Sequence, residues 1–211
     1  MSRRIVALGS GLVASIAAGT AFAAEDCMVE AGGIGLGLVI PDRGCETTVL
    51  TDVQIAAATT NWTDFRVRGT AEVGAMWSVK DHTPAHVGVA FAVSGTEPDP
   101  DDANSRTAVD TALMMRSRYW LPPFPGGVSM ILDAAAGPAV YVETDQPIRY
   151  GGYFEVGTSL HGMLGLFFAA EPTVSARDQT LHTRYAVGAK TTAAGFLIVL
   201  SIYACAQTTC Y

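Results

Sequence analysis

Long apolar runs are scarce in this chain, and so are charged residues and cysteines. Beyond the N-terminal leader, no segment has the ~20 consecutive apolar residues that a membrane-spanning helix needs; the longest run, residues 196–206, is too short. Acidic residues outnumber basic ones by 20 to 13. This balance excludes a nucleic-acid partner, which requires a basic surface.

The first 23 residues have the features of a cleaved signal peptide. Arg3 and Arg4 form a basic start, residues 5–18 are apolar, and Ala21-Phe22-Ala23 is a small-x-small cleavage site. A twin-arginine leader is the weaker alternative, because the residues around the two arginines do not support it. Cleavage after Ala23 removes these two positive charges and changes the formal net charge from −7 to −9.

Residues 64–80 show the clearest periodicity of the mature chain. Apolar and polar side chains alternate here without interruption, as they do in a β-strand, where successive side chains point to opposite faces. Phe65 and Trp77 lie near the two ends, about 30 Å apart along the axis of a barrel whose strands tilt by roughly 40°. This spacing is typical of the aromatic girdles that flank the apolar band of a transmembrane barrel.

The same alternation recurs along the rest of the chain, between turns rich in Gly, Pro, Asn and Asp. Pro138 predicts a bulge or break within its strand, because proline has no N–H to donate to a neighbour. A glycine-rich segment, residues 24–46, precedes the predicted β-domain at 47–211. The predicted strands are 47–57, 64–80, 85–93, 112–121, 128–143, 152–168, 181–193 and 196–205.

The second face of these strands combines small residues with a few charges of both signs. Small side chains and internally paired charges suit the narrow, filled lumen that about eight strands enclose. The predicted lumen charge network consists of Arg66, Arg68, Glu72, Arg116, Arg118, Asp133, Glu155, Arg184 and Lys190. On the opposite face we expect Val67, Val73, Phe154, Leu164 and Leu166 to face lipid.

In this pattern, residues 47–206 resemble the small, eight-stranded outer-membrane β-barrels of Gram-negative bacteria. The resemblance implies insertion into the outer membrane, with lipid as the partner of the wall and both termini in the periplasm. The expected fold is therefore all-β, a single antiparallel up-and-down barrel of about eight strands. Its expected role is structural or interactive, through loops 95–108 and 144–151, without catalysis or a cofactor.

Two other functions remain open at this point. A secreted or periplasmic β-sandwich could bind a ligand or partner, and an outer-membrane barrel could hydrolyse lipid. Glu155, Ser159 and His161 share a face and have the residue types of a hydrolase site. They point to the lumen, however, where lipid does not reach, so a structural polar network is the better interpretation. His86 and His182 lack metal-ligand spacing, and we predict no metal site.

The four cysteines predict disulfides, because the chain is exported. If the first spanning strand starts at Thr47, all four lie at the periplasmic end. We then expect the pairs Cys27–Cys45 and Cys205–Cys210, with cross-pairing between the two ends of the chain as the alternative.

Overall fold

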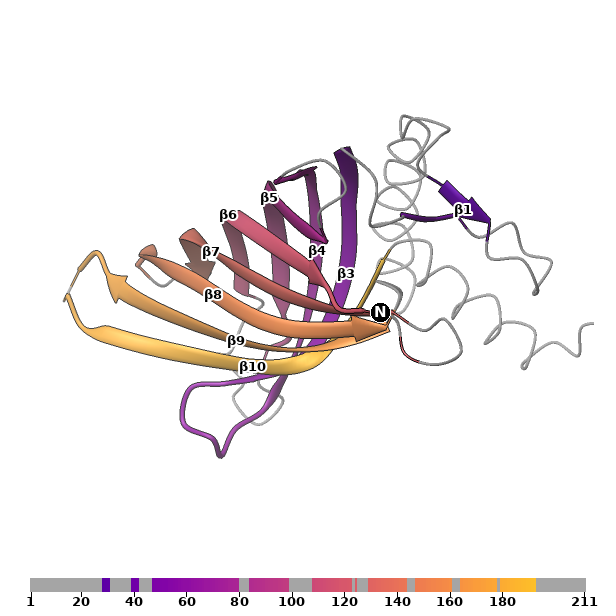
Figure 1. Ribbon diagram of the computed structural model, residues 1–211. Coiled ribbons are helices and arrows are strands. Elements are labelled where there is room, and N and C mark those ends of the chain that lie inside the picture. The colour runs from indigo at the N-terminus through magenta and orange to yellow at the C-terminus, as the bar shows by residue number, and fades with distance from the viewer. Residues whose placement is uncertain are drawn as a thin grey trace, which may run out of the picture.

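The computed structural model describes residues 28–30, 39–41, 47–79, 84–98, 108–122, 124, 129–143, 147–160, 164–177 and 179–192. These residues form β-strands and their connections (Figure 1). Two short strands, β1 (Met28–Glu30) and β2 (Val39–Pro41), pair antiparallel with each other. Within the described ranges, no helix is long and apolar enough to cross a membrane.

Eight long strands close into one antiparallel barrel, in which each strand pairs with its neighbours in sequence and β10 pairs with β3. This is the up-and-down barrel that the alternation predicts, so the fold prediction is confirmed and a β-sandwich is ruled out. The strands are β3 (Thr47–Thr59), β4 (Arg66–Ser78), β5 (Ala85–Thr96), β6 (Ala108–Trp120), β7 (Met130–Glu143), β8 (Arg149–Leu160), β9 (Leu164–Ser175) and β10 (Leu181–Thr192).

The register of the strands sets the tilt of the barrel. Directly opposed residues, followed once around the barrel from Thr47, lead back to β3 at Ala57, a stagger of ten residues. With eight strands, that stagger corresponds to a tilt of about 40° from the barrel axis. The path runs through Thr47, Trp77, Val87, Ser117, Ala134, Val156, Phe168, Val187 and Ala57.

One predicted strand is wrong, because residues 152–168 form parts of two strands. β8 ends at Leu160 and β9 begins at Leu164. Both of these leucines are exposed on the outer wall, so the alternation continues in phase across the three-residue connection. The periodicity therefore gave no sign of the hairpin. The strand predicted at 196–205 lies outside the described residues, as do the signal peptide and all four cysteines.

Pro138 interrupts the sheet on one side only. The pairing of β7 with β6 passes from Ala136 to Ala139 without including Gly137 or Pro138, whereas the pairing with β8 is continuous. The missing N–H of proline accounts for a break on one side of the strand.

The connections divide the barrel into two ends. Residues 60–65, 97–107, 144–148 and 176–180 connect strands at one end, called the mouth below. Residues 79–84, 121–129 and 161–163 connect them at the opposite end, where β3 begins and β10 ends.

Candidate functional site

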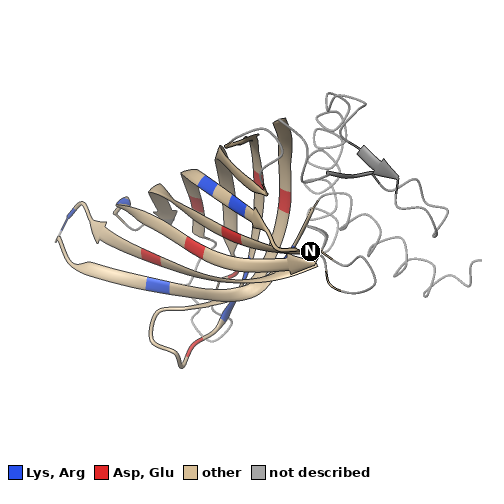
Figure 2. Ribbon diagram, viewed as in Figure 1, with Lys and Arg blue, Asp and Glu red and all other residues tan. Residues whose placement is uncertain are grey.

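Charged residues of both signs are distributed along the strands of the barrel (Figure 2), and those whose side chains are described occupy inward-phase positions. The structure places seven of the nine predicted lumen residues in buried positions, and Arg66 and Arg184 in half-buried positions near the mouth. Each lies at the inward phase of its strand, because strand residues alternate between the two faces. The seven buried residues are Arg68, Glu72, Arg116, Arg118, Asp133, Glu155 and Lys190.

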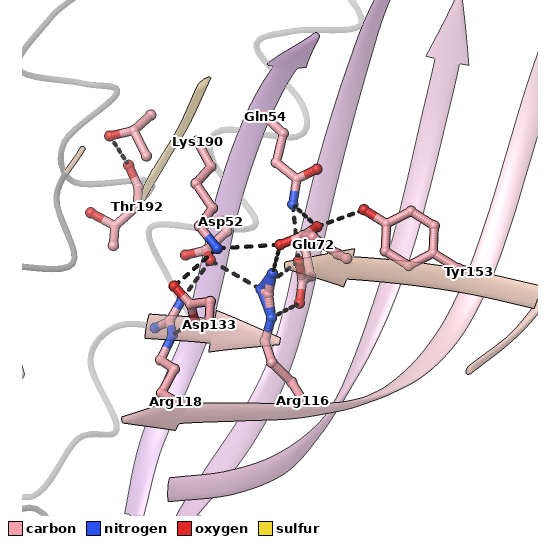
Figure 3. Close-up of polar contacts among 11 residues, drawn as sticks. Asp52, Gln54, Glu72, Arg116, Arg118, Asp133, Tyr153, Lys190 and Thr192 are labelled. Atoms are coloured by element: carbon pink, nitrogen blue, oxygen red, sulfur yellow. Dashed lines mark hydrogen bonds and ion pairs between the residues drawn. The ribbon is translucent and has the colours of Figure 1, made fainter. Parts of the chain in front are cut away.

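Arg116 is at the centre of the first of two ion-pair clusters (Figure 3). Its Nη2 lies 2.6 Å from Glu155 Oε1, its Nε lies 3.0 Å from Glu72 Oε1, and its Nη1 lies 3.5 Å from Asp52 Oδ2. Asp52 and Glu72 are directly opposed on β3 and β4, where like charges destabilise a sheet. The guanidinium of Arg116 binds both carboxylates and so offsets their repulsion.

Asp133 joins Arg118 and Lys190 to this central cluster. Arg118 Nε donates to Asp133 Oδ1 over 2.7 Å, and Arg118 Nη2 donates to Asp52 Oδ2 over 2.6 Å. Lys190 Nζ lies 2.9 Å from Asp133 Oδ2 and 3.2 Å from Glu155 Oε1. Residues from β3, β4, β6, β7, β8 and β10 therefore meet in one network.

A second cluster, the mouth cluster, consists of Arg68, Asp110, Glu171 and Arg184. Arg68 and Arg184 both bind Glu171, the latter at 2.6 Å, and Arg184 also pairs with Asp110. Tyr153 links the two clusters, because its hydroxyl donates to Glu155 over 2.6 Å and its ring lies 6.0 Å from the Arg68 guanidinium.

The two clusters contain six carboxylates and five cations, so nearly all of the buried charge is compensated. Removing one partner of a buried ion pair typically costs about 3–5 kcal/mol, because the other partner remains charged and desolvated. The clusters therefore fix the positions of the strands that carry them. The members are Asp52, Glu72, Asp110, Asp133, Glu155, Glu171, Arg68, Arg116, Arg118, Arg184 and Lys190.

Sequence reasoning missed three of these carboxylates. Asp52 lies on the polar face of its predicted strand but is not among the nine residues of the predicted lumen network. Asp110 follows the predicted loop 95–108 and Glu171 lies beyond the predicted strand 152–168, so neither was placed on a strand. The inward phase of Arg116, followed along β6, includes Asp110, and the inward phase of Glu155 on β8 continues across the three-residue connection into β9, where it includes Glu171.

The hydrolase interpretation gains no support from the surroundings of Glu155. Its carboxylate binds Arg116, Lys190, Gln54 and Tyr153, and the nearby Ser159 is buried in the interior. His161 lies outside the described residues. No group of three or more His, Cys, Asp or Glu residues in the described chain could hold a metal ion.

A cavity of about 340 Å³ opens at the mouth and is lined by residues of all eight strands and their connections. The mouth cluster contributes Asp110 and Arg184 to it. Arg66, Arg149 and His182 lie on its wall, and His182 Nε2 is 2.9 Å from Thr180 Oγ1.

The outer wall has the opposite character to the interior. Among the described side chains of the eight strands, every Asp, Glu, Lys, Arg and His occupies an inward-phase position. Outward positions carry aliphatic, aromatic and small residues, including all five that we expected to face lipid, which are 52–67% exposed.

Aromatic residues of the outer wall gather near its two ends, where the exposed Phe65 accompanies the Trp and Tyr residues at the mouth. Outward-facing Trp and Tyr residues lie near the strand ends, whereas Phe91, Phe154 and Phe168 lie between them. Trp62 stacks on Tyr185 with ring centroids 5.0 Å apart. The outward Trp and Tyr residues are Trp62, Tyr150 and Tyr185 near the mouth and Trp77 and Tyr119 near the opposite end.

The chain matches no model of a known protein family. Comparison with curated proteins also gives no significant match.

Proposed function

We propose that this chain is an outer-membrane β-barrel protein whose wall contacts lipid and whose loops at the mouth interact with molecules outside the cell. The observation that carries the proposal is the uncharged outer wall of the eight strands. One arginine or lysine at the bilayer midplane costs about 2–4 kcal/mol in such a wall, so lipid favours a surface from which charges are excluded. A wall in contact with water would not need to exclude charged residues.

The aromatic residues support the same proposal. Trp and Tyr have a polar tip and an apolar ring, so they are enriched at the two interfaces of a membrane. The wall has them near both ends, and three phenylalanines, Phe91, Phe154 and Phe168, lie between them. A water-soluble barrel that binds apolar ligands would have the reverse arrangement, with apolar residues inside and charges outside.

The three tryptophans allow a direct test of the proposal. Trp62 and Trp77 are 54% and 47% exposed at opposite ends of the wall, whereas Trp120 is 6% exposed and packs against His86 inside. Three variants, each retaining one tryptophan with the other two changed to Phe, are reconstituted in vesicles with lipids brominated along the acyl chain. Trp62 and Trp77 should be quenched most strongly by bromines near the headgroup, and Trp120 should be quenched little at any depth. Quenching of Trp62 and Trp77 by aqueous iodide alone would contradict the proposal.

The orientation is tested separately with inserted epitope tags. The connections 97–107 and 144–148 lie at the mouth and include most of the predicted interaction loops, whereas 121–129 lies at the opposite end. A tag after Pro98 should be detected by antibody on intact cells, and a tag after Leu121 only after the outer membrane is permeabilised. The reverse result would show that the mouth faces the periplasm.

A further inference from the structure

Two residues that line the mouth cavity each carry a buried polar atom without a hydrogen-bond partner among the described residues. Thr96 and Asp110 line the cavity and are 4% and 3% exposed, and neither Thr96 Oγ1 nor Asp110 Oδ1 has a hydrogen-bond partner among the described residues. Buried polar atoms are nearly always hydrogen-bonded in native structures, so such a pair requires an explanation. Both face inward on neighbouring strands, one on β5 and one on β6.

These two atoms are complementary to a hydroxyl group. The Thr96 hydroxyl can donate or accept a hydrogen bond, and the ionised Asp110 carboxylate can only accept one. A ligand hydroxyl that accepts from Thr96 and donates to Asp110 would satisfy both. Arg184, which also lines the cavity, donates to the other carboxylate oxygen of Asp110.

Arg149 provides a positive charge on another wall of the same cavity. It lies at an inward-phase position of β8 and is half-buried, and it forms no ion pair with any carboxylate that the structure describes. Arg66, on β4, lines the cavity from four strands away in a ring of eight, which places it on the wall opposite Arg149. The acidic residues Asp64 and Glu97 also line the cavity, but both are exposed.

From this arrangement we infer that the mouth cavity binds a small hydroxylated anion, such as a sugar phosphate or a sugar acid. Arg149 binds the phosphate or carboxylate, because a guanidinium matches either group with paired N–H donors. Thr96 and Asp110 bind a hydroxyl on the far side of the ligand. The volume of about 340 Å³ is at the lower end of the range for ligand pockets. A binding site of this kind goes beyond the lipid-facing wall and interacting loops proposed above, and it does not depend on membrane insertion.

The test uses the folded chain in a polyoxyethylene detergent, whose headgroup has neither charge nor sugar. Glucose 6-phosphate, glucuronate, glucose and inorganic phosphate are titrated by calorimetry. At least one of the two sugar anions should bind saturably, and at least tenfold more tightly than glucose or phosphate. Whichever sugar anion binds more tightly identifies the anionic group. No saturable binding of either one would overturn the inference.

Variants then assign the binding to the cavity. Arg149→Gln should weaken binding of the tighter sugar anion more than tenfold, and Thr96→Val should weaken it while leaving the response to inorganic phosphate unchanged. Arg177→Gln is the matched control, because it removes the same charge at the mouth end from an exposed residue that does not line the cavity. Equal affinities for the Arg149 and Arg177 variants would overturn the assignment. Heat-modifiable migration on a gel confirms that each variant is folded.

Because binding is measured in micelles, it can fail while the lipid-quenching test succeeds, or the reverse. The two proposals are therefore tested independently.

Discussion

At the scale of single residues, the interior depends most on Arg116. This side chain is fully buried and is held by carboxylates from three strands, β3, β4 and β8. Changing Arg116 to Met keeps most of the side-chain volume but removes the cation that these carboxylates bind.

We expect Arg116→Met to lower the free energy of unfolding by about 3–5 kcal/mol. The measurement is urea unfolding of the protein in vesicles, followed by tryptophan fluorescence. Arg177→Met, which removes an exposed arginine, should change the free energy of unfolding by about 0.5 kcal/mol or less. The additional change Glu155→Gln should restore part of the loss, because it removes one of the unpaired charges. A loss for Arg116→Met no larger than that for Arg177→Met would mean that the ion pairs contribute little.

Val73 tests the outer wall, because it lies near the middle of β4 and Val67 lies near the mouth end of the same strand. Both are 52% exposed on the same face. Val73→Arg should cost about 2–4 kcal/mol and Val67→Arg about 0–1 kcal/mol, if the two lie at the midplane and near the interface of a bilayer. The comparison uses the same unfolding measurement in vesicles. Equal costs at the two depths would contradict a lipid-facing wall.

The sequence was sufficient to predict whether a strand residue faces the lumen or the outer wall. It was not sufficient to predict which residues each one contacts. Alternation alone assigns Glu72 inward and Val73 outward, because it depends only on neighbouring positions. The polar contacts of the interior join residues far apart in the chain: the hydrogen-bonded Gln54 and Glu155 are separated by 101 positions and the ion pair of Arg68 and Glu171 by 103. Such contacts depend on the strand order and on a stagger that no local pattern encodes.

At the scale of strands, two glycines of the barrel differ in the space that a side chain would find. A Cβ built at Gly188 of β10 would lie 2.2 Å from the carbonyl oxygen of Ile55, on the strand that closes the barrel. A Cβ at Gly95 of β5 would meet no atom within 4 Å.

The same substitution should therefore have opposite effects at the two sites. Gly188→Ala should destabilise the barrel by about 1–3 kcal/mol, because the backbones of β10 and β3 must move apart. Gly95→Ala should be neutral or stabilising by up to about 1 kcal/mol, because it restricts the unfolded chain. The midpoint of urea unfolding measures both changes. An equal effect at the two sites would show that the seam between β10 and β3 adjusts without strain.

The hairpin connection at 161–163, between β8 and β9, could not be predicted from the sequence. Leu160 and Leu164 both face outward, so nothing in the alternation marks the end of β8. Turn chemistry was the only remaining signal, and Gly162 alone, within an otherwise continuous pattern, is too weak to carry it.

At the scale of the whole molecule, the filled interior predicts that the barrel conducts poorly. The ion-pair clusters occupy the lumen together with buried Leu50, Met76 and Met114. An eight-stranded barrel has an interior just wide enough for side chains to fill. Purified protein in planar bilayers should therefore give no stable, large single-channel currents, and such currents would contradict the prediction. Arg116→Met serves as the comparison, because loosening the central cluster should make brief openings more frequent.

The alternation of the strands also has a consequence for export. In the unfolded chain, polar residues separate the apolar residues of every strand, so no stretch is apolar enough to be retained as a helix by a membrane that it crosses. The apolar wall exists only after the strands have paired and their polar side chains have turned inward. On the proposed outer-membrane localisation, the unfolded chain would therefore cross the inner membrane without being retained in it, and the apolar wall would form only where the strands pair in the outer membrane.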